Sequence, residues 1–272
     1  MNEKLELKEN NYKEIIDIFR EAATKASKVI NDIYSTNFET ELKSDNTPVT
    51  KADIESNKII LKILRKQFPS IPIISEEEKY NKNKVYNEFI LIDPLDGTKE
   101  FINKNGEFTV NIALIQNKIP KLGVVQLPTS GIQYFSDGTE SFKINKNKKK
   151  KLIIKQTKNF TIACSKSHLD NQILRFLDLI GNKHKILRKG SSLKFCLVAE
   201  SKASIYIRFG KTMEWDIAAG HSILRTSGGH VKNLNYKSNE IKYGKKNLQN
   251  SAFIAHGKID DLEKIIILAK QV

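Results

Sequence analysis

The chain has 272 residues, of which 39% are hydrophobic and 28% are charged, and it carries a formal net charge of +15 at pH 7. This composition is that of a globular protein with enough residues to bury a large core. It shows no repeats of fixed period and no apolar run near the roughly 20 residues that span a bilayer, which excludes repeat and membrane-spanning proteins. Two cysteines, Cys164 and Cys196, are too few for a disulfide framework, and their apolar neighbours predict buried free thiols.

The positive charge comes almost entirely from lysine, which provides 40 of the 46 basic residues. A strongly basic surface attracts nucleic acid or a small polyanion. Arginine is scarce and no aromatic-basic ribonucleoprotein pattern is present, which argues against a nucleic-acid partner. A Lys-rich nucleic-acid-binding protein stays open as the non-enzymatic alternative. The segment 1–8 mixes both signs of charge and lacks the apolar core of a secretory signal, so we expect a cytoplasmic protein.

Two helices are predicted in the first quarter of the chain. Apolar residues recur at helical spacing over residues 12–34, and a second apolar stripe follows a polar approach and ends before Pro69. Thr50 and Asp53 fit a capping box at the start of the second helix. Capping alone is a sufficient explanation for both residues, so a functional role needs evidence from elsewhere in the chain.

The central turn follows an apolar run at 89–92 that predicts a buried strand. The segment Asp93–Thr98 contains a proline and a glycine, which make the turn stiff. A stiff turn can direct oxygens of Asp93, Leu95 and Asp96 at one small volume, and such oxygens suit a hard divalent cation such as Mg²⁺. The alternative is an ordinary turn, because Asp-Pro and Asp-Gly need no metal to explain them.

Two further predicted strands also lead into acidic residues. The strand at 71–74 leads into Glu76, and the strand at 204–209 leads to Asp216. Glu76 alone is explained by a solvated acidic loop, and Asp216 alone by an N-cap. Because layered folds place ligand sites beyond strand ends, three such junctions together indicate one shared site.

The remaining pattern predicts a mixed α+β or α/β layered fold. Antiparallel strands are expected at 106–115, 119–127 and 132–135, and the basic stretch Lys146–Lys151 is expected to be a solvated loop. The chain is accordingly divided into an N-terminal α+β half, 1–155, and a C-terminal α/β half, 156–272. Elements expected in the second half are strands at 160–164 and 203–209 and helices at 168–180, from 191, from 216 and at 259–269.

Four separated motifs resemble the inositol monophosphatase superfamily of metal-dependent phosphatases: 47–53, 75–77, 93–98 and 215–220. Within it, the segments 96–101, 105–113 and 190–196 are similar to 3′(2′),5′-bisphosphate nucleotidases of the CysQ type. The similarity covers about 43–229. Lys211, Ile217 and Ser75 stand where many members have Pro, Thr and Gly. These departures remove no carboxylate, so they concern specificity more than catalysis.

The resemblance implies an alternating αβαβα sandwich and a set of Mg²⁺ ligands. Glu76, Asp93 and the Leu95 carbonyl would bind one ion, Asp93, Asp96 and Asp216 a second, and a third, weaker ion would lie near Glu76. Crowded carboxylates repel each other unless cations neutralise them, which agrees with this arrangement. The catalytic residues implied are Thr98 and Asp53, which would orient the attacking water and accept its proton, together with Glu76.

The resemblance also implies a small-molecule substrate, adenosine 3′,5′-bisphosphate, which is hydrolysed to AMP and phosphate. This reaction clears a by-product of sulfate assimilation, and Li⁺ is expected to inhibit it. Nucleotide contacts are expected around a helix start, with His168 beside the base unless it is an ordinary surface histidine. The residues expected to bind substrate are Gly97, Ser191, Ser192, Lys194, Arg208 and Asp216.

An inositol monophosphatase or other sugar-phosphate phosphatase is the enzymatic alternative. No nucleic-acid partner and no stable membrane insertion are expected. The oligomeric state, monomer or homodimer, stays open, as does peripheral contact with the inner membrane.

Overall fold

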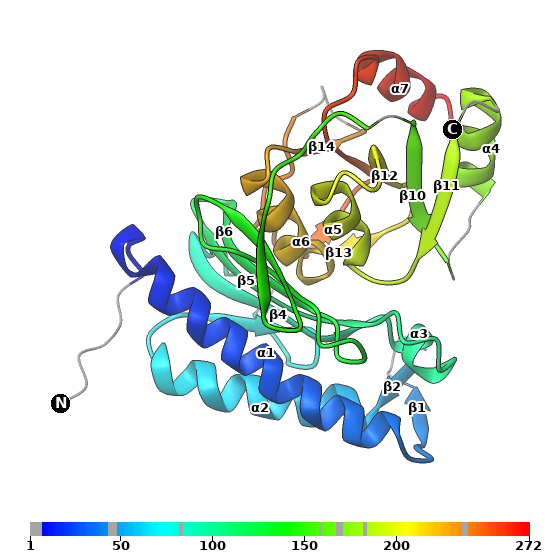
Figure 1. The fold of residues 1–272 in the computed structure, drawn as a ribbon. Helices are drawn as coiled ribbons and strands as arrows, with labels where there is room; N and C mark the ends of the chain where they lie inside the picture. Colours follow the sequence, from blue (N-terminus) through cyan, green and yellow to red (C-terminus); the bar gives the residue numbers. More distant parts are fainter. Residues whose placement is uncertain are drawn as a thin grey trace.

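The computed structural model describes residues 7–42, 48–81, 84–157, 159–166, 171–181, 184–235 and 239–272. Helices and sheets alternate in layers, with α1 and α2 on one side of a large sheet and a second sheet beyond it (Figure 1). Helices α5 and α6 lie between the two sheets, and α4 and α7 cover the outer face of the second sheet. The expected αβαβα sandwich is confirmed.

The first layer is a pair of helices, α1 (Tyr12–Tyr34) and α2 (Lys51–Gln67), preceded by the short 3₁₀ helix η1 (Glu9–Asn11). The bounds expected for α1 are confirmed. Its stripe of Ile15, Phe19 and Ile30 is fully buried against α2 and the large sheet, and that burial stabilises a helix more than propensity does. The ribbon β1 (Thr40–Leu42) and β2 (Pro48–Thr50) leads into α2.

In the described part of the chain, the large sheet has seven strands in chain order. Its first two strands are parallel and the remaining pairs are antiparallel. The central run at 89–92 is apolar throughout because its residues alternate between two cores: Phe89 and Leu91 face α5 and α6, and Ile90 and Ile92 face α1 and α2. The strands are β3 (Ile73–Ser75), β4 (Glu88–Asp96), β5 (Thr109–Gln116), β6 (Ile119–Gln126), β7 (Gln133–Ser136), β8 (Ser141–Asn145) and β9 (Lys148–Leu152).

The basic stretch Lys146–Lys151 is not a solvated loop, and that prediction is wrong. Lys146 and Asn147 form the turn of a hairpin with φ of 45° and 65°, and the lysines after them make the exposed edge strand β9. Lys149 lies 3.8 Å from the centroid of the Phe142 ring, so this lysine packs on the sheet instead of pointing only to solvent. Lysines on an edge strand discourage pairing with another chain, which accounts for a charged sequence in a β-strand.

The second sheet has the strand order β11-β10-β12-β16-β14. Its strands are β10 (Thr161–Ser165), β11 (Lys185–Lys189), β12 (Ile205–Arg208), β14 (His230–Asn233) and β16 (Phe253–His256). The helices are α4 (Asn171–Ile180), α5 (Leu193–Ala199), α6 (Glu214–Thr226) and α7 (Leu262–Ala269). The small elements are α3 (Thr98–Ile102), β13 (Thr212–Met213) and β15 (Gln249–Asn250).

Helix α6 comes from the second half of the chain but packs on β5 and β6 of the large sheet. The division at residue 155 therefore stays a prediction. Cys164 and Cys196 are buried free thiols, as expected. Among the described residues, no helix has the length and apolar character to cross a membrane.

Gly123→Ala is expected to destabilise the contact between β6 and α6. A Cβ at Gly123 would lie 2.6 Å from the Ala219 carbonyl oxygen and 2.9 Å from the Ala219 Cα, so the helix has to move away. Overpacking of this kind costs about 1–3 kcal/mol, which urea denaturation followed by circular dichroism measures. Gly210→Ala is the matched control, because the nearest atom to its Cβ is 3.4 Å away. Equal unfolding midpoints for both variants would contradict the expectation.

Candidate metal centre

The candidate site begins where β3 and β4 end. These strands are parallel, so their carboxyl ends meet at one edge of the sheet, and the Glu76 N–H donates to the Ile92 carbonyl at 3.1 Å. The ladder with β5 shifts register between Asp93 and Asp96, and Gly97 turns the chain into α3 with φ of 96°. This left-handed conformation is costly for other residues, so the glycine directs the two aspartates before it.

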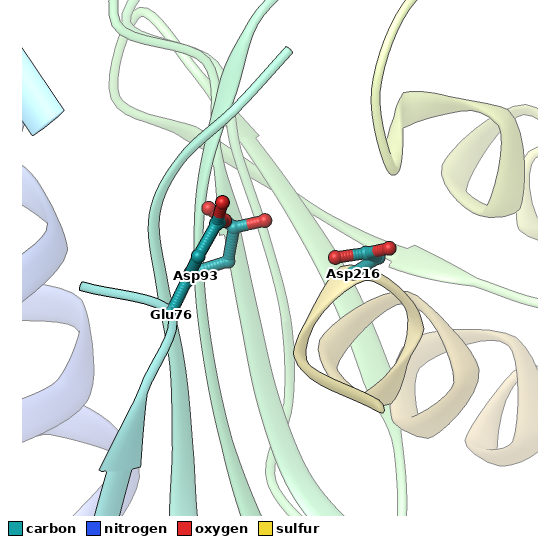
Figure 2. A group of neighbouring side chains, drawn as sticks. All are labelled: Glu76, Asp93 and Asp216. Atoms are coloured by element: carbon teal, nitrogen blue, oxygen red, sulfur yellow. The ribbon is translucent and has the colours of Figure 1, made fainter. Parts of the chain in front are cut away.

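Asp216 approaches the same place from the first turn of α6. The helix begins at Glu214, two residues earlier than expected, with Met213 as its N-cap. Asp216 is therefore the third residue of the helix, where its Oδ2 accepts the Met213 N–H at 2.8 Å. Carboxylate oxygens of Glu76, Asp93 and Asp216 lie within 4.8 Å of one another, with Asp216 across from the other two (Figure 2).

Asp96 lines the same cavity, of about 350 Å³, and its carboxylate accepts hydrogen bonds from two other segments of the chain. Its Oδ2 accepts the Ser192 N–H at 2.5 Å and the Asn111 Nδ2 at 3.4 Å. Leu95 also lines the cavity, and its N–H donates to the Asp93 Oδ1 at 3.1 Å. The structure thus brings all five predicted metal-binding residues to one cavity, with Asp96 tied to the loop before α5.

The carboxylates of this cavity are electrostatically strained. Burial, followed by repulsion from Glu76, Asp96 and Asp216, raises the pKa of Asp93 well above its usual value. Burial and the nearby Asp96 carboxylate do the same for the pKa of Asp216, and burial raises the pKa of Asp96 to about 6. Clustered buried carboxylates with oxygen donors only are suited to a hard divalent cation, which removes the repulsion. The residues present therefore fit Mg²⁺.

Asp53 takes part in both the cap and the site. Its Oδ2 accepts the Thr50 N–H at 2.8 Å and the Thr50 hydroxyl at 2.6 Å, and the Ala52 N–H donates to the Thr50 Oγ1 at 3.2 Å, which confirms the capping box. The other oxygen, Oδ1, accepts the Thr98 hydroxyl at 3.1 Å, and Thr98 lines the cavity. The structural and functional interpretations of Asp53 are thus compatible.

The expected substrate residues form the cationic side of this cavity. Lys194, in α5, is buried, and its Nζ donates to the Ser191 carbonyl at 2.5 Å. Burial lowers the pKa of Lys194 to about 8. Among the described residues, the buried Ser191 Oγ and Arg208 Nε have no hydrogen-bond partner. Because buried polar atoms are normally paired, these two atoms indicate where a polar ligand would bind. Gly97 also lines the cavity.

The Ser192 N–H differs from the expectation, because it donates to Asp96 instead of pointing at the substrate side. The first turn of α5 therefore does not offer this donor to a phosphate. His168, expected beside the base, lies outside the described residues.

A buried polar network behind Asp96 was not recognised in the sequence. The Ser192 hydroxyl donates to the Asn111 Oδ1 at 2.7 Å and lies 2.9 Å from the Thr109 Oγ1. All three residues are almost completely buried. The available signal was two polar residues inside the otherwise apolar strand β5, at positions that face one side. Such partners hold a ligating carboxylate in one orientation.

Alternating layers with a carboxylate cluster at the strand ends, beside a cationic pocket, define a metal-dependent phosphatase. The model of the inositol monophosphatase family matches residues 11–268, and the chain belongs to that family. The chain is 43% identical over 237 residues to the 3′(2′),5′-bisphosphate nucleotidase CysQ of Buchnera aphidicola, covering 84% of this chain and 89% of that protein. It is 42% identical over 191 residues to CysQ of Escherichia coli K12, covering 70% and 77%.

Solved structures agree with this membership. The crystal structure of CysQ from Bacteroides thetaiotaomicron superposes with a TM-score of 0.81 at 35% identity, covering 91% of this chain and 98% of that one. An inositol monophosphatase from Thermotoga maritima also gives a TM-score of 0.81, at 20% identity, with coverage of 95% and 97%. At that identity the likeness is one of fold alone.

Removal of divalent cations is expected to make stability fall as the pH rises. A carboxyl group whose pKa is higher in the folded state still holds its proton at a pH where the unfolded chain has lost it. The free energy of unfolding therefore falls as the pH rises from the unfolded pKa to the folded pKa. For Asp96 the loss runs from about pH 4, the unfolded pKa, to about pH 6. Thermal unfolding in EDTA should show this decline, and Mg²⁺ should abolish it. A decline of the same size with and without Mg²⁺ would contradict a metal at these residues.

Proposed function

We propose that this protein is a Mg²⁺-dependent 3′(2′),5′-bisphosphate nucleotidase that hydrolyses adenosine 3′,5′-bisphosphate to AMP and phosphate. The observation that carries the proposal is the pairing, in one cavity, of a carboxylate cluster with two cations, the buried Lys194 and the partly buried Arg208. Carboxylates suit the metal-assisted release of one phosphate, and the cations suit a second phosphate that stays on the product. The similarity to two CysQ proteins supports the same substrate.

Glu76, Asp93, Asp96, Asp216 and the Leu95 carbonyl would hold the metal ions, two or three in number. The chemistry that Mg²⁺ supplies when bound is neutralisation of charge on the transferred phosphoryl group and a lower pKa for the attacking water.

The proton of that water is accepted by the pair Thr98 and Asp53. The Thr98 hydroxyl donates its own proton to the Asp53 Oδ1, so its oxygen lone pairs remain to accept one from water. Burial raises the pKa of Asp53, which makes the carboxylate a better base than an exposed aspartate. Asp53 is held in place by the capping box, so no rearrangement is needed.

The 5′-phosphate would lie against the Arg208 guanidinium and the buried Lys194 ammonium, with the Ser191 hydroxyl beside them. Charge-assisted hydrogen bonds of this kind are about twice as strong as neutral ones. They would favour a bisphosphorylated nucleotide over a sugar monophosphate. The proposal also places the enzyme in the clearance of a by-product of sulfate assimilation.

Phosphate release from a substrate panel tests the proposal. The panel contains adenosine 3′,5′-bisphosphate, 3′-AMP and inositol 1-phosphate, each with Mg²⁺ and with EDTA. We expect the bisphosphate to have the highest kcat/KM and EDTA to abolish all turnover. Faster turnover of inositol 1-phosphate would favour the sugar-phosphate alternative and overturn the proposed substrate.

Arg208→Gln separates the two phosphates of the substrate. Removal of the guanidinium is expected to raise the KM for adenosine 3′,5′-bisphosphate about tenfold or more, because a hydrogen bond to a charged group contributes about 1.5–3 kcal/mol. The KM for 3′-AMP should change little, since that substrate lacks the 5′-phosphate. An equal rise for both substrates would show that Arg208 does not bind the 5′-phosphate.

A further inference from the structure

A second cavity, of about 770 Å³, adjoins the active-site cavity. Among the described residues, Lys211 alone lines both. Lys211 directly precedes β13, and β13 pairs with β15, whose residues Gln249 and Asn250 line the second cavity. We call this space the Lys211 cavity. It is therefore separated from the metal centre by one short ribbon.

The segment between β12 and β13 connects the two cavities. Arg208 lines the active-site cavity, and Phe209 lines the Lys211 cavity. A Cβ at Gly210 would lie 3.4 Å from an Arg208 guanidinium nitrogen, so the Arg208 charge lies beside the residue that precedes Lys211. Arg208 in one cavity and Phe209 in the other are adjacent in the chain, so a ligand bound at Arg208 has a short path to the Lys211 cavity.

The lining of the Lys211 cavity is polar and cationic. The side chains of Lys211 and Lys242 are exposed and have no hydrogen bond or ion pair with any described residue, whereas Lys245 is paired with Glu214 at 2.7 Å. The carboxylate in the described lining, Glu240, is already bonded to two histidines. The two free lysines outnumber this carboxylate, so the described lining carries a net positive charge.

An aromatic ring and amide side chains complete this lining. Phe209 is held edge-to-face by Phe176, with ring centroids 5.8 Å apart, and Gln249 and Asn233 line the cavity with it. An aromatic ring for stacking, amides for base edges and lysines for phosphate are the groups that bind nucleotides. The groups that line the cavity therefore suit a nucleoside with a phosphate attached.

We propose that the Lys211 cavity binds a second nucleotide that is joined to the substrate through its 5′-phosphate. The enzyme would then remove the terminal 3′-phosphate of short 3′-phosphorylated oligonucleotides, of which ApAp is the simplest. Water adds to the terminal phosphorus, the bond from phosphorus to the 3′ oxygen breaks, and the 3′ oxygen takes up a proton. Inorganic phosphate leaves, and the phosphodiester is untouched. This inference rests on the proposed nucleotidase function.

The test compares kcat/KM for ApAp and for adenosine 3′,5′-bisphosphate in wild type and three variants. Lys242→Ala removes a free charge from the cavity, and Phe209→Leu keeps an apolar side chain but removes the stacking ring. Lys148→Ala is the matched control, since it removes an exposed lysine from β9. We expect Lys242→Ala and Phe209→Leu to lower kcat/KM for ApAp about tenfold and that for the bisphosphate less than about twofold. The control should change neither.

Three results would overturn the inference. Turnover of the bisphosphate without turnover of ApAp would overturn the inference and leave the proposed function intact. An equal fall in kcat/KM for ApAp and for the bisphosphate would show that Lys242 and Phe209 do not bind the second nucleotide specifically. Absence of turnover with both substrates in wild type would overturn the proposed function itself. Thermal unfolding of each variant identifies a loss that comes from misfolding, and in that case Lys242→Ala, a surface change, decides.

Discussion

Asp93→Asn is expected to lower kcat by about a thousandfold or more while making the metal-free protein more stable. Asp93 is 1% exposed, and its pKa is raised first by this burial and then by four carboxylates: Glu76, Asp96, Asp216 and Asp53. A metal ion contributes several kcal/mol of charge stabilisation in the transition state, and each 1.36 kcal/mol is tenfold in rate. Asp93 is the proposed central charged ligand, so its replacement should remove most of that stabilisation. Phosphate release at saturating substrate over a range of Mg²⁺ concentrations measures it.

The expected gain in stability of metal-free Asp93→Asn comes from the removal of electrostatic repulsion. Asn keeps the side-chain oxygen that accepts the Leu95 N–H, but it removes the charge that the neighbouring carboxylates repel. In EDTA at neutral pH, Asp93→Asn should therefore have a higher Tm than wild type. Asp178→Asn, an exposed change on α4, is the control and should alter neither property. Wild-type turnover in Asp93→Asn would refute the metal centre, whatever its stability.

The sequence predicted elements well where one physical signal dominated. Helix α1 has a single apolar stripe, and its expected bounds are the observed ones. The central strand was recognised because β4 is buried on both faces, which requires a continuous apolar run. The basic strand β9 was missed because it is an edge strand rich in lysine. Charged residues protect a sheet edge from pairing with another chain, and they give the strand the same composition as a solvated loop.

Strand β11 was missed for a related reason. Its residues Lys185–Lys189 are mostly exposed and lie at the edge of the second sheet, so its short polar sequence carries little hydrophobic pattern. Pairing with the buried strand β10 holds it in the sheet. Contacts supplied by a distant neighbour cannot be deduced from a local period.

The candidate site followed the same logic. Glu76, Asp93 and Asp216 were connected by one rule, that layered folds place ligand sites beyond strand ends, and the structure brings them together. No local sequence pattern predicts the hydrogen bonds among Thr109, Asn111 and Ser192, because two of these residues are in β5 and the third precedes α5. They depend on a tertiary contact, and only the structure reveals them.

Asp53→Asn is expected to lower kcat by about a hundredfold to ten thousandfold, the range for loss of a general base. In the wild type, the Asp53 Oδ1 accepts the Thr98 hydroxyl, and Oδ2 accepts both the Thr50 N–H and the Thr50 hydroxyl. An asparagine has one accepting oxygen, so it can keep only part of these hydrogen bonds. The variant therefore loses the proposed base and weakens the helix cap, so stability should also fall. Single-turnover phosphate release measures the chemical step, and urea denaturation measures the free energy of unfolding.

Thr50→Ala separates the two roles of Asp53. It removes the cap hydroxyl that bonds to Asp53 and to the Ala52 N–H, and leaves the contact between Asp53 and Thr98 in place. Its free energy of unfolding should fall by about 1 kcal/mol, while kcat stays within a few fold of wild type. Thr98→Val tests the other half, because it removes the hydroxyl beside Asp53 without touching the cap, and should lower kcat with little change in unfolding. If Thr50→Ala lost as much activity as Asp53→Asn, the effect of Asp53 on catalysis would come from the cap, and the carboxylate would not be the base.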